Sequence, residues 1–242
     1  MTRLLAFDTS TEVMSIAVRL PGRTLCFEGE GGAQASARLI PEILSLLGEA
    51  GCTLQQLDAI AFGRGPGAFT GLRSACSVAQ GLALGAGKPV LPLDSLLLVA
   101  QDALDERDER DAGADFDCWV AMDARMDEIY AAHYRWTAGR WQVELPPLLC
   151  RSEALNEHWA HAPPAHVAGS ALAAFGARLH TGAAVLRPAT RSRARALAGL
   201  ADAAWRDGAG VDAALALPVY LRDKVAQTTA ERDAARAAGA PA

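Results

Sequence analysis

Residues 4–20 read LLAFDTSTEVMSIAVRL, and residues 119–136 read WVAMDARMDEIYAAHYRW. In each stretch an apolar strand ends in Ala-x-Asp, a short polar turn follows, and a second strand leaves the turn. When the two stretches are aligned, Asp123 lies opposite Asp8. The chain is therefore expected to hold two related halves, each opening with a β-hairpin that carries an acidic residue at the end of its first strand.

The sequence around the first stretch predicts three antiparallel strands followed by alternating helices and strands. The expected elements are helix 35–50, strand 58–63, helix 69–85, strand 89–93 and helix 95–104. Residues 102–117 hold six Asp, two Glu and two Arg, which is typical of a solvated loop between two halves. The predicted class is α/β.

After the charged run the pattern begins again with three strands. It continues with helix 152–159, strand 166–170, helix 171–179, helix 192–206 and an ordered segment at 218–222. We assign residues 1–104 to the N-terminal half and 118–226 to the C-terminal half. Helix 192–206 is a candidate to pack back on the first half. Residues 227–242 are rich in Ala, Arg and Asp and are expected to form a flexible tail.

The composition excludes some functions. The chain has 242 residues, of which 51% are hydrophobic, and a net charge of −5, which argues against gripping a phosphate backbone unaided. The five cysteines lack the close spacing of a zinc knuckle or a redox dithiol, so reduced thiols are expected. No apolar run is long enough to cross a membrane, and we expect a cytoplasmic protein.

The strongest local motif is GRGPGAFTGLR at residues 63–73, between a strand and a helix. Its glycines and proline predict a sharp, fixed turn, and Thr70 is placed to cap the helix that follows. The N-terminus of a helix attracts anions, so Thr70 and Arg73 are candidate anion contacts. The spacing fits neither a Walker loop nor a dinucleotide fingerprint. A rigid turn that sets the helix against the sheet remains the alternative.

The two hairpins are typical of proteins that hold a nucleotide phosphate between two halves. Such turns need glycine to bring backbone N–H groups to the phosphate, and neither turn here has one. Asp8, Thr9 and Ser10 remain candidate nucleotide contacts, although Glu12 and Asp127 add negative charge there. The alternative is that Asp8 and Asp123 only accept backbone N–H groups in tight turns.

The sequence resembles the TsaB (YeaZ) family of the bacterial threonylcarbamoyladenosine machinery. The matching motifs run in the family order: FDTSTE at 7–12, GRGPGAFTGLR at 63–73, AQGLALGAGKPV at 79–90, AMDARMDEIYAAHY at 121–134 and PVYLRDKVA at 218–226. The resemblance implies an actin-like ATPase or sugar-kinase (RNase H-like) fold with two related βββαβα halves. One departure is Ala35–Ser36, where the family often has a His-Ser or His-Thr pair.

The resemblance also implies a partner, TsaD, which transfers threonylcarbamoyl to the tRNA adenosine beside the anticodon. TsaD binds a metal through two histidines, and Ser95 and Val99 stand at those positions here. Neither can be an imidazole ligand, so no metal site and no catalytic residue are predicted. No cofactor is expected beyond weak ATP or ADP binding.

In the family, the first two helices form the dimerisation surface, as a four-helix bundle with TsaD or with a second copy of the chain. The implied interface residues are Leu39, Ile43, Leu46, Leu47, Leu72, Ala75, Val78, Ala79 and Leu82. The alternative is that these side chains all face their own sheet.

The predicted function is a non-catalytic scaffold that binds TsaD, helps to recruit the ATPase TsaE, and meets tRNA only through the complex. It would form a homodimer when alone. Two alternatives stay open: an ATP-dependent enzyme of this fold (a kinase or a peptidase), and a tRNA-binding module.

Overall fold

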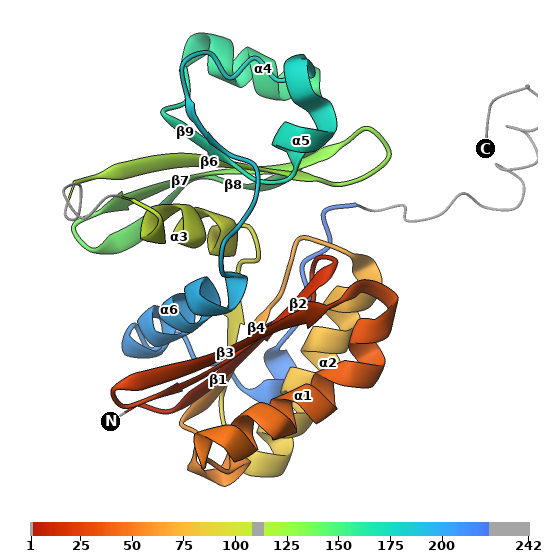
Figure 1. Ribbon diagram of the computed structural model, residues 1–242, viewed down its shortest axis with the longest axis vertical. Coiled ribbons are helices and arrows are strands. Elements are labelled where there is room, and N and C mark those ends of the chain that lie inside the picture. Colours follow the sequence, from red (N-terminus) through yellow and green to blue (C-terminus); the bar gives the residue numbers. More distant parts are fainter. Residues whose placement is uncertain (1, 108–113, 223–242) are drawn as a thin grey trace, which may run out of the picture.

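The computed structural model describes residues 2–107 and 114–222, apart from the side chain of Ala33. Two five-stranded sheets dominate it (Figure 1). The first sheet has the order β3-β2-β1-β4-β5. Its strands are β1 (Leu4–Asp8), β2 (Val13–Leu20), β3 (Arg23–Glu30), β4 (Ala59–Gly63) and β5 (Val90–Leu93).

The second sheet repeats the first. Its order, read from the matching edge, is β8-β7-β6-β9-β10. The strands are β6 (Phe116–Asp123), β7 (Ile129–Thr137), β8 (Arg140–Cys150), β9 (His166–Ala168) and β10 (Val185–Arg187). In both sheets the first hairpin is antiparallel and the next strand joins parallel to the first. The predicted relation between the halves is thus confirmed, while the short β10 was not predicted.

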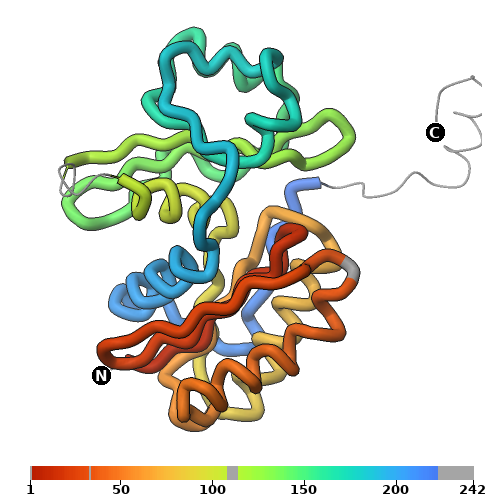
Figure 2. The backbone as a smooth tube through the Cα atoms, viewed as in Figure 1, coloured from red at the N-terminus to blue at the C-terminus, as the bar shows by residue number. Residues whose placement is uncertain are grey.

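The helices lie in three layers around the two sheets (Figures 1 and 2). One layer holds α1 (Ala35–Ala50) and α2 (Phe69–Ala86), and the middle layer holds α3 (Leu97–Asp105) and α6 (Arg193–Arg206). The outer face of the second sheet carries α4 (Ser152–His161) and α5 (Ala171–Phe175). Strand alternation explains this arrangement: Leu5 and Phe7 of β1 face α1 and α2, whereas Leu4 and Ala6 face α6.

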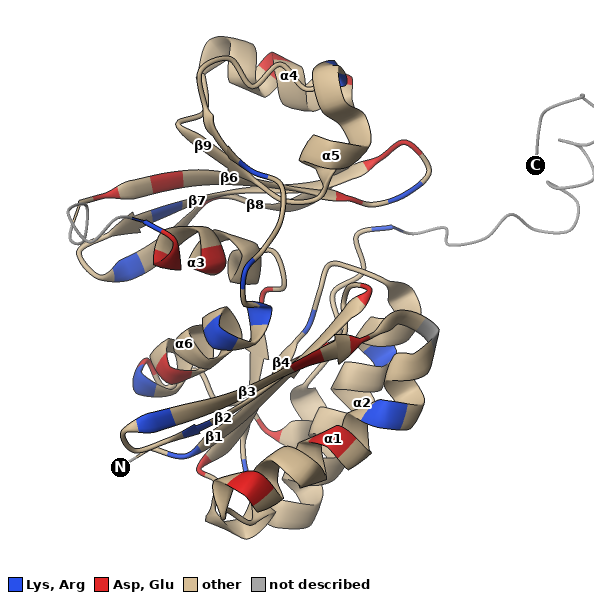
Figure 3. Ribbon diagram, viewed as in Figure 1, with Lys and Arg blue, Asp and Glu red and all other residues tan. Residues whose placement is uncertain are grey.

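Local sequence sets the length of the first two helices. Gly51 caps the C-terminus of α1 and Gly87 that of α2, both with positive φ, and the next N–H in each case bonds back to the last turn. This is the glycine stop expected at helix C-termini. Charges of both signs are spread over the two halves (Figure 3). Helix α2 carries a single charged residue, Arg73.

The charged run differs from its prediction. Residues 102–105 belong to α3, and 108–113 lie outside the described residues. Asp102 is buried, and its carboxylate accepts the N–H groups of Arg191 and Ser192 at 2.8 Å. The run is therefore not wholly solvated, because part of it anchors the start of α6.

The end of the described chain lies on the first half. Helix α6 packs on β1 through Leu197, Leu200 and Ala201. Further along, Val90 and Val211 form a bridge, and the carbonyl of Ala216 accepts from Gln80 of α2 at 2.9 Å. The tail predicted at 227–242 lies outside the described residues.

Candidate functional site

A cavity of about 630 Å³ lies between the two halves. Its lining includes the turn after β1, the β4–α2 turn, the turn after β6 and residues 219–222, together with residues 95–96, 169–170 and 188–190. Arg193 at the start of α6 closes one side. The volume falls in the usual range for small-molecule sites. The repeated hairpins therefore face a common space, as their alignment in the sequence suggests.

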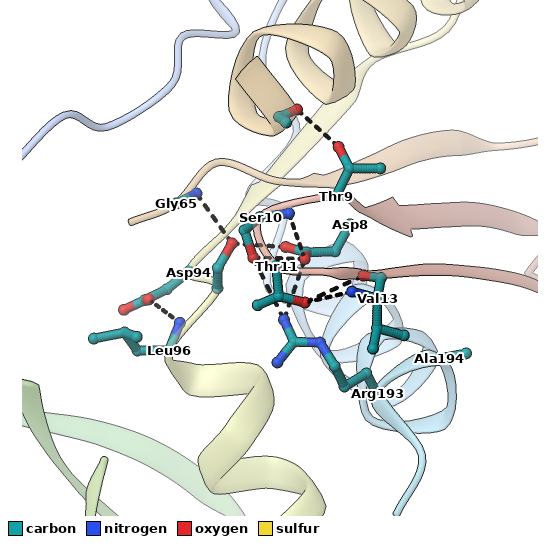
Figure 4. Close-up of polar contacts among 12 residues, drawn as sticks. Asp8, Thr9, Ser10, Thr11, Val13, Gly65, Asp94, Leu96, Arg193 and Ala194 are labelled. Carbon is teal, nitrogen blue, oxygen red and sulfur yellow. Dashed lines mark hydrogen bonds and ion pairs between the residues drawn. The ribbon is translucent and has the colours of Figure 1, made fainter. Parts of the chain in front are cut away.

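Asp8 is completely buried at the end of β1, and both of its carboxylate oxygens are bonded inside the protein (Figure 4). Its Oδ1 accepts from the N–H of Ser10 at 3.0 Å and from the Ser10 hydroxyl at 2.6 Å. Its Oδ2 accepts from the Ser95 hydroxyl at 2.7 Å. Asp8 thus does accept a backbone N–H in a tight turn, as one of the two sequence interpretations held.

Arg193 supplies the counter-charge. Its Nη2 lies 3.1 Å from Asp8 Oδ1 and 3.4 Å from the Ser10 hydroxyl, and the residue is only 3% exposed. The sequence analysis missed this partner. One arginine among three in RSRAR at 191–195 carries no local signal, since only packing of α6 on β1 brings it to Asp8. The acidic residue of the first hairpin is therefore neutralised in the interior.

The other candidate nucleotide contacts do not gather around Asp8. The Thr9 hydroxyl is buried and donates to the carbonyl of Gly71 at 2.7 Å. Thr70 is exposed and is not the helix cap, because the N-cap of α2 is Ala68. Arg73 is exposed too, with its guanidinium 3.8 Å from the centre of the Phe69 ring. Only Asp8 and Ser10 share a network, and the expected capping by Thr70 is wrong.

The glycines of the β4–α2 turn allow close packing against the first hairpin turn. A Cβ on Gly63 would overlap the Asp8 carboxylate, one on Gly67 the backbone of Ser10, and one on Gly71 the carbonyl of Thr9. Gly65 also has a φ of +106°, in the region that favours glycine. The motif therefore serves as a rigid turn that fixes α2 against the sheet.

The turn after β6 has a different chemistry. Asp123 Oδ1 accepts the Arg125 N–H at 2.8 Å, and the Asp123 side chain stays 20% exposed. Asp127 forms a two-point ion pair with Arg178, at 2.6 and 2.9 Å, and this hydrogen-bonded partner holds the pKa of Asp127 below its ordinary value. Across the cavity, Arg125 lies 3.7 Å from Glu12 of the first turn.

Asp94, beside the Asp8 network, joins the two halves. The hydroxyl of Tyr134 on β7 donates to Asp94 Oδ2 at 2.6 Å. Burial raises the pKa of Asp94, and the hydrogen bond from Tyr134 opposes that rise. This hydrogen bond therefore connects the residue after β5 of the first sheet to β7 of the second sheet.

The metal positions of the resembling family have other roles here. Ser95 is bonded to Asp8 and accepts the N–H of Gly65, and Val99, within α3, lies in the hydrophobic core. Within residues 2–107 and 114–222, no group of three or more His, Cys, Asp or Glu could hold a metal ion. None of the helices in these ranges is both long and apolar enough to span a bilayer.

The predicted interface residues need correction. Seven of the nine are buried in the chain's own core: Leu39, Ile43, Leu46, Leu47, Leu72, Ala75 and Ala79. Val78 and Leu82 are partly buried against the same core. These side chains face the first sheet because α1 and α2 must cover its apolar face. The exposed large apolar side chains of the two helices are instead Ile40, Leu44 and Leu84.

Comparison with known proteins gives consistent matches. A family model described as TsaD, tRNA N6-adenosine threonylcarbamoyltransferase, matches residues 32–178. The tRNA threonylcarbamoyladenosine biosynthesis protein TsaB of Escherichia coli is 32% identical over 232 residues, spanning 93% of this chain and 96% of that protein. The protein of the same name from Haemophilus influenzae is 42% identical over 127 residues, about half of each chain.

Solved structures agree with these matches. YeaZ from Pseudomonas aeruginosa superposes with a TM-score of 0.80 at 38% identity, covering 91% of this chain and all of that one. A second P. aeruginosa structure, described as similar to the peptidase YeaZ, gives a TM-score of 0.81 at 38% identity and covers 92% of this chain. With the two repeated sheets, these likenesses confirm the predicted actin-like, RNase H-like fold.

Proposed function

Because the chain belongs to the TsaB (YeaZ) family, we propose that it is a non-catalytic partner subunit in the synthesis of threonylcarbamoyladenosine in tRNA. The names of its relatives indicate a role in that pathway. The finer proposal is that the chain binds TsaD, keeps it competent for transfer, and helps to recruit TsaE. It would contact tRNA only through the complex, in the cytoplasm.

The observation that carries the non-catalytic role is the state of Asp8. A carboxylate that is to bind a metal or a nucleotide needs free lone pairs facing the cavity. Both oxygens of Asp8 are already bonded within the protein, and Arg193 neutralises its charge. The matching acid, Asp123, is bonded to its own turn. This supports a fold retained for binding a partner.

The proposed partner-binding face is the exposed side of α1 and α2. Ile40 and Leu44 are 43% and 52% exposed and stand four residues apart on α1, so they share one side of the helix. Leu84 on α2 is 80% exposed, and Gly81 and Gly85 beside it permit close approach. The TsaD family model covers both helices, which supports pairing with a TsaD chain of like fold as a four-helix bundle.

The proposal is tested by reconstitution with purified TsaD, TsaE, ATP, threonylcarbamoyl-adenylate and tRNA. We expect modified adenosine only when the chain is added, and equal product without it would refute the role. Ile40→Asp is expected to abolish co-purification with TsaD while leaving the thermal midpoint nearly unchanged. Val143→Asp is the matched control, because Val143 is 56% exposed but lies on β8 of the second half.

The same two variants test the homodimer proposed for the isolated chain. In sedimentation velocity, Ile40→Asp is expected to shift a dimer to monomer, and Val143→Asp is expected to leave it intact. Ile43→Asp is unsuitable for this purpose, because Ile43 is fully buried and the change would unfold the chain.

One observation supports a nucleotide-binding role, namely the cavity of about 630 Å³ between the halves. We propose at most weak ATP or ADP binding there, since neither hairpin turn has a glycine to bring backbone N–H groups to the phosphates. Calorimetric titration with ATP measures this. Turnover of ATP by the isolated chain that is lost in Asp8→Ala would favour the enzyme instead, and steeply salt-dependent tRNA binding by the chain alone would favour the tRNA-binding module.

A further inference from the structure

The C-terminal strap, which we define as residues 218–222, passes from the first half to the second along the cavity. At its start the N–H of Val219 donates to the carbonyl of Arg64 at 2.7 Å. The carbonyl of Val219 lies so near Gly65 that a Cβ on that glycine would be 2.9 Å away. The strap is therefore seated closely on the β4–α2 turn.

The next strap residue reaches the start of α2. The rings of Tyr220 and Phe69 have centroids 4.9 Å apart, and Arg73 Nε donates to the Tyr220 hydroxyl at 3.3 Å. Tyr220 is 43% exposed, and Arg73 is exposed beside it. A partner that covers the N-terminal end of α2 would therefore touch the strap as well as the helix.

The last described strap residue holds the second half. Arg222 Nη2 donates to the carbonyl of Ala124 at 3.0 Å and to that of Arg125 at 3.3 Å, and it forms an ion pair with Glu128. The Arg222 side chain is only 15% exposed, which strengthens such contacts relative to surface pairs. Arg222 thus contacts both ends of the turn after β6, at Ala124 and at Glu128.

That turn stores strain. Arg125, Met126 and Asp127 have φ values of +62°, +55° and +61°, although none is glycine. Each non-glycine residue in this region costs about 1–2 kcal/mol, and such conformations persist only where the surroundings impose them. Two arginines do so here: Arg178, from the same half, pairs with Asp127, and Arg222 comes from the strap.

We propose that the strap is a conformational coupler between the cleft and the partner-binding face. With Arg222 in place, the turn keeps its left-handed form and the halves stay closed over the cavity. A partner that contacts Tyr220 and Arg73 favours the seated strap, and by linkage the seated strap strengthens partner binding. The part of this inference that concerns docking rests on the proposed function, whereas the link between the halves does not.

Hydrogen exchange on the full-length chain alone tests the link. Arg222→Met is expected to lose protection in two places, the turn at 124–128 and the first-half segment 64–73. The matched control is Arg178→Met, which removes the other arginine on the same turn and is expected to lose protection only in the second half. If both variants affect the same segments, or if Arg222→Met leaves 64–73 protected, the strap does not join the halves and the proposal is wrong.

Affinity for TsaD tests the coupling. Arg222→Met, and Glu128→Gln on the other side of the ion pair, are expected to weaken binding about fivefold or more, with Arg178→Met near wild type. Wild-type affinity in Arg222→Met overturns the coupling. If the wild-type chain does not bind TsaD, both the proposed function and the coupling of the strap to partner binding are wrong. The hydrogen-exchange experiment tests the link between the two halves independently of that result.

Discussion

The turns after β1 and after β6 occupy the same place in two matching sheets, and their surroundings differ. In the first turn, Asp8 is fully buried and paired with Arg193 of α6, 185 residues further along the chain. In the second, Asp123 and Asp127 are partly exposed and pair with arginines at the surface. The turn of the first hairpin is therefore buried in the interior, whereas the turn of the second is strained and is contacted by Arg178 and Arg222 from other segments.

The difference shows that the order of the strands and the charge pairing at the turns are determined separately in this fold. The hairpin, the parallel strand beside it and the sheet order are the same in both halves because the same apolar alternation builds both sheets. The charges at the turns depend on what packs over them. Helix α6 covers the first turn, whereas Arg178 and the strap contact the second.

The largest expected effect comes from breaking the buried ion pair. Arg193→Met leaves Asp8 buried without its counter-charge and is expected to lower the free energy of unfolding by about 3–5 kcal/mol. Arg125→Met in the second turn is expected to cost less than about 1 kcal/mol, because Arg125 is 72% exposed. Urea denaturation measures both. Similar losses would mean that the two turns are energetically alike.

The next effect concerns close packing at the first turn. Gly71→Ala places a Cβ against the carbonyl of Thr9 and is expected to destabilise the fold by about 1–3 kcal/mol. Gly81→Ala on the same helix meets no atom within 4 Å and is expected to be neutral or stabilising. Thermal melts compare the pair, and a harmless Gly71→Ala would show that the glycine turn is not tightly packed.

A smaller, opposite effect is expected at the second turn. Met126→Gly relieves a left-handed residue and is expected to raise the free energy of unfolding by up to about 1 kcal/mol. Ala124→Gly, in the same turn but without a positive φ, is expected to lower it by about 0.5–1 kcal/mol. A loss of stability in Met126→Gly would contradict the assigned strain.

The smallest effect is expected at Asp94, whose hydrogen bond with Tyr134 connects the two halves. Burial raises the pKa of Asp94 above its ordinary value of 3.8, so the folded chain binds this proton more tightly than the unfolded chain. The stability contributed by Asp94 therefore falls as pH rises from that value through the folded pKa. Asp94→Asn is expected to gain stability relative to wild type as the pH rises above about 4, until the folded pKa is passed. A difference that is constant with pH would contradict this.

Much of the fold could be predicted from the sequence. Helix α1 has the predicted bounds, α2 differs by one residue, and the internal repeat appears as two sheets of one order. Periodicity and glycine stops are local signals, and they suffice for such elements. The left-handed turn at 125–127 carries no glycine to reveal it, and β10 is only three residues long.

The candidate site depended on contacts between distant residues. The acidic strand ends and the glycine turn were found from the sequence, but Arg193, Arg222 and Arg178 were not, because they come from segments far along the chain. The interface residues were misplaced for a related reason. A pattern of apolar residues identifies the apolar side of α1, but it does not say whether a sheet of the same chain or a partner covers that side.

The sequence by itself determined the repeated hairpins, the helices that follow them, and the rigid turn at residues 63–73, because periodicity, glycine and proline act within a few residues. Tertiary structure alone decided that Asp8 is neutralised, that Ile40 and Leu44 rather than Ile43 are exposed, and that the strap holds the second turn. Burial and charge pairing depend on which surfaces meet, and that is set by the packing of the whole chain.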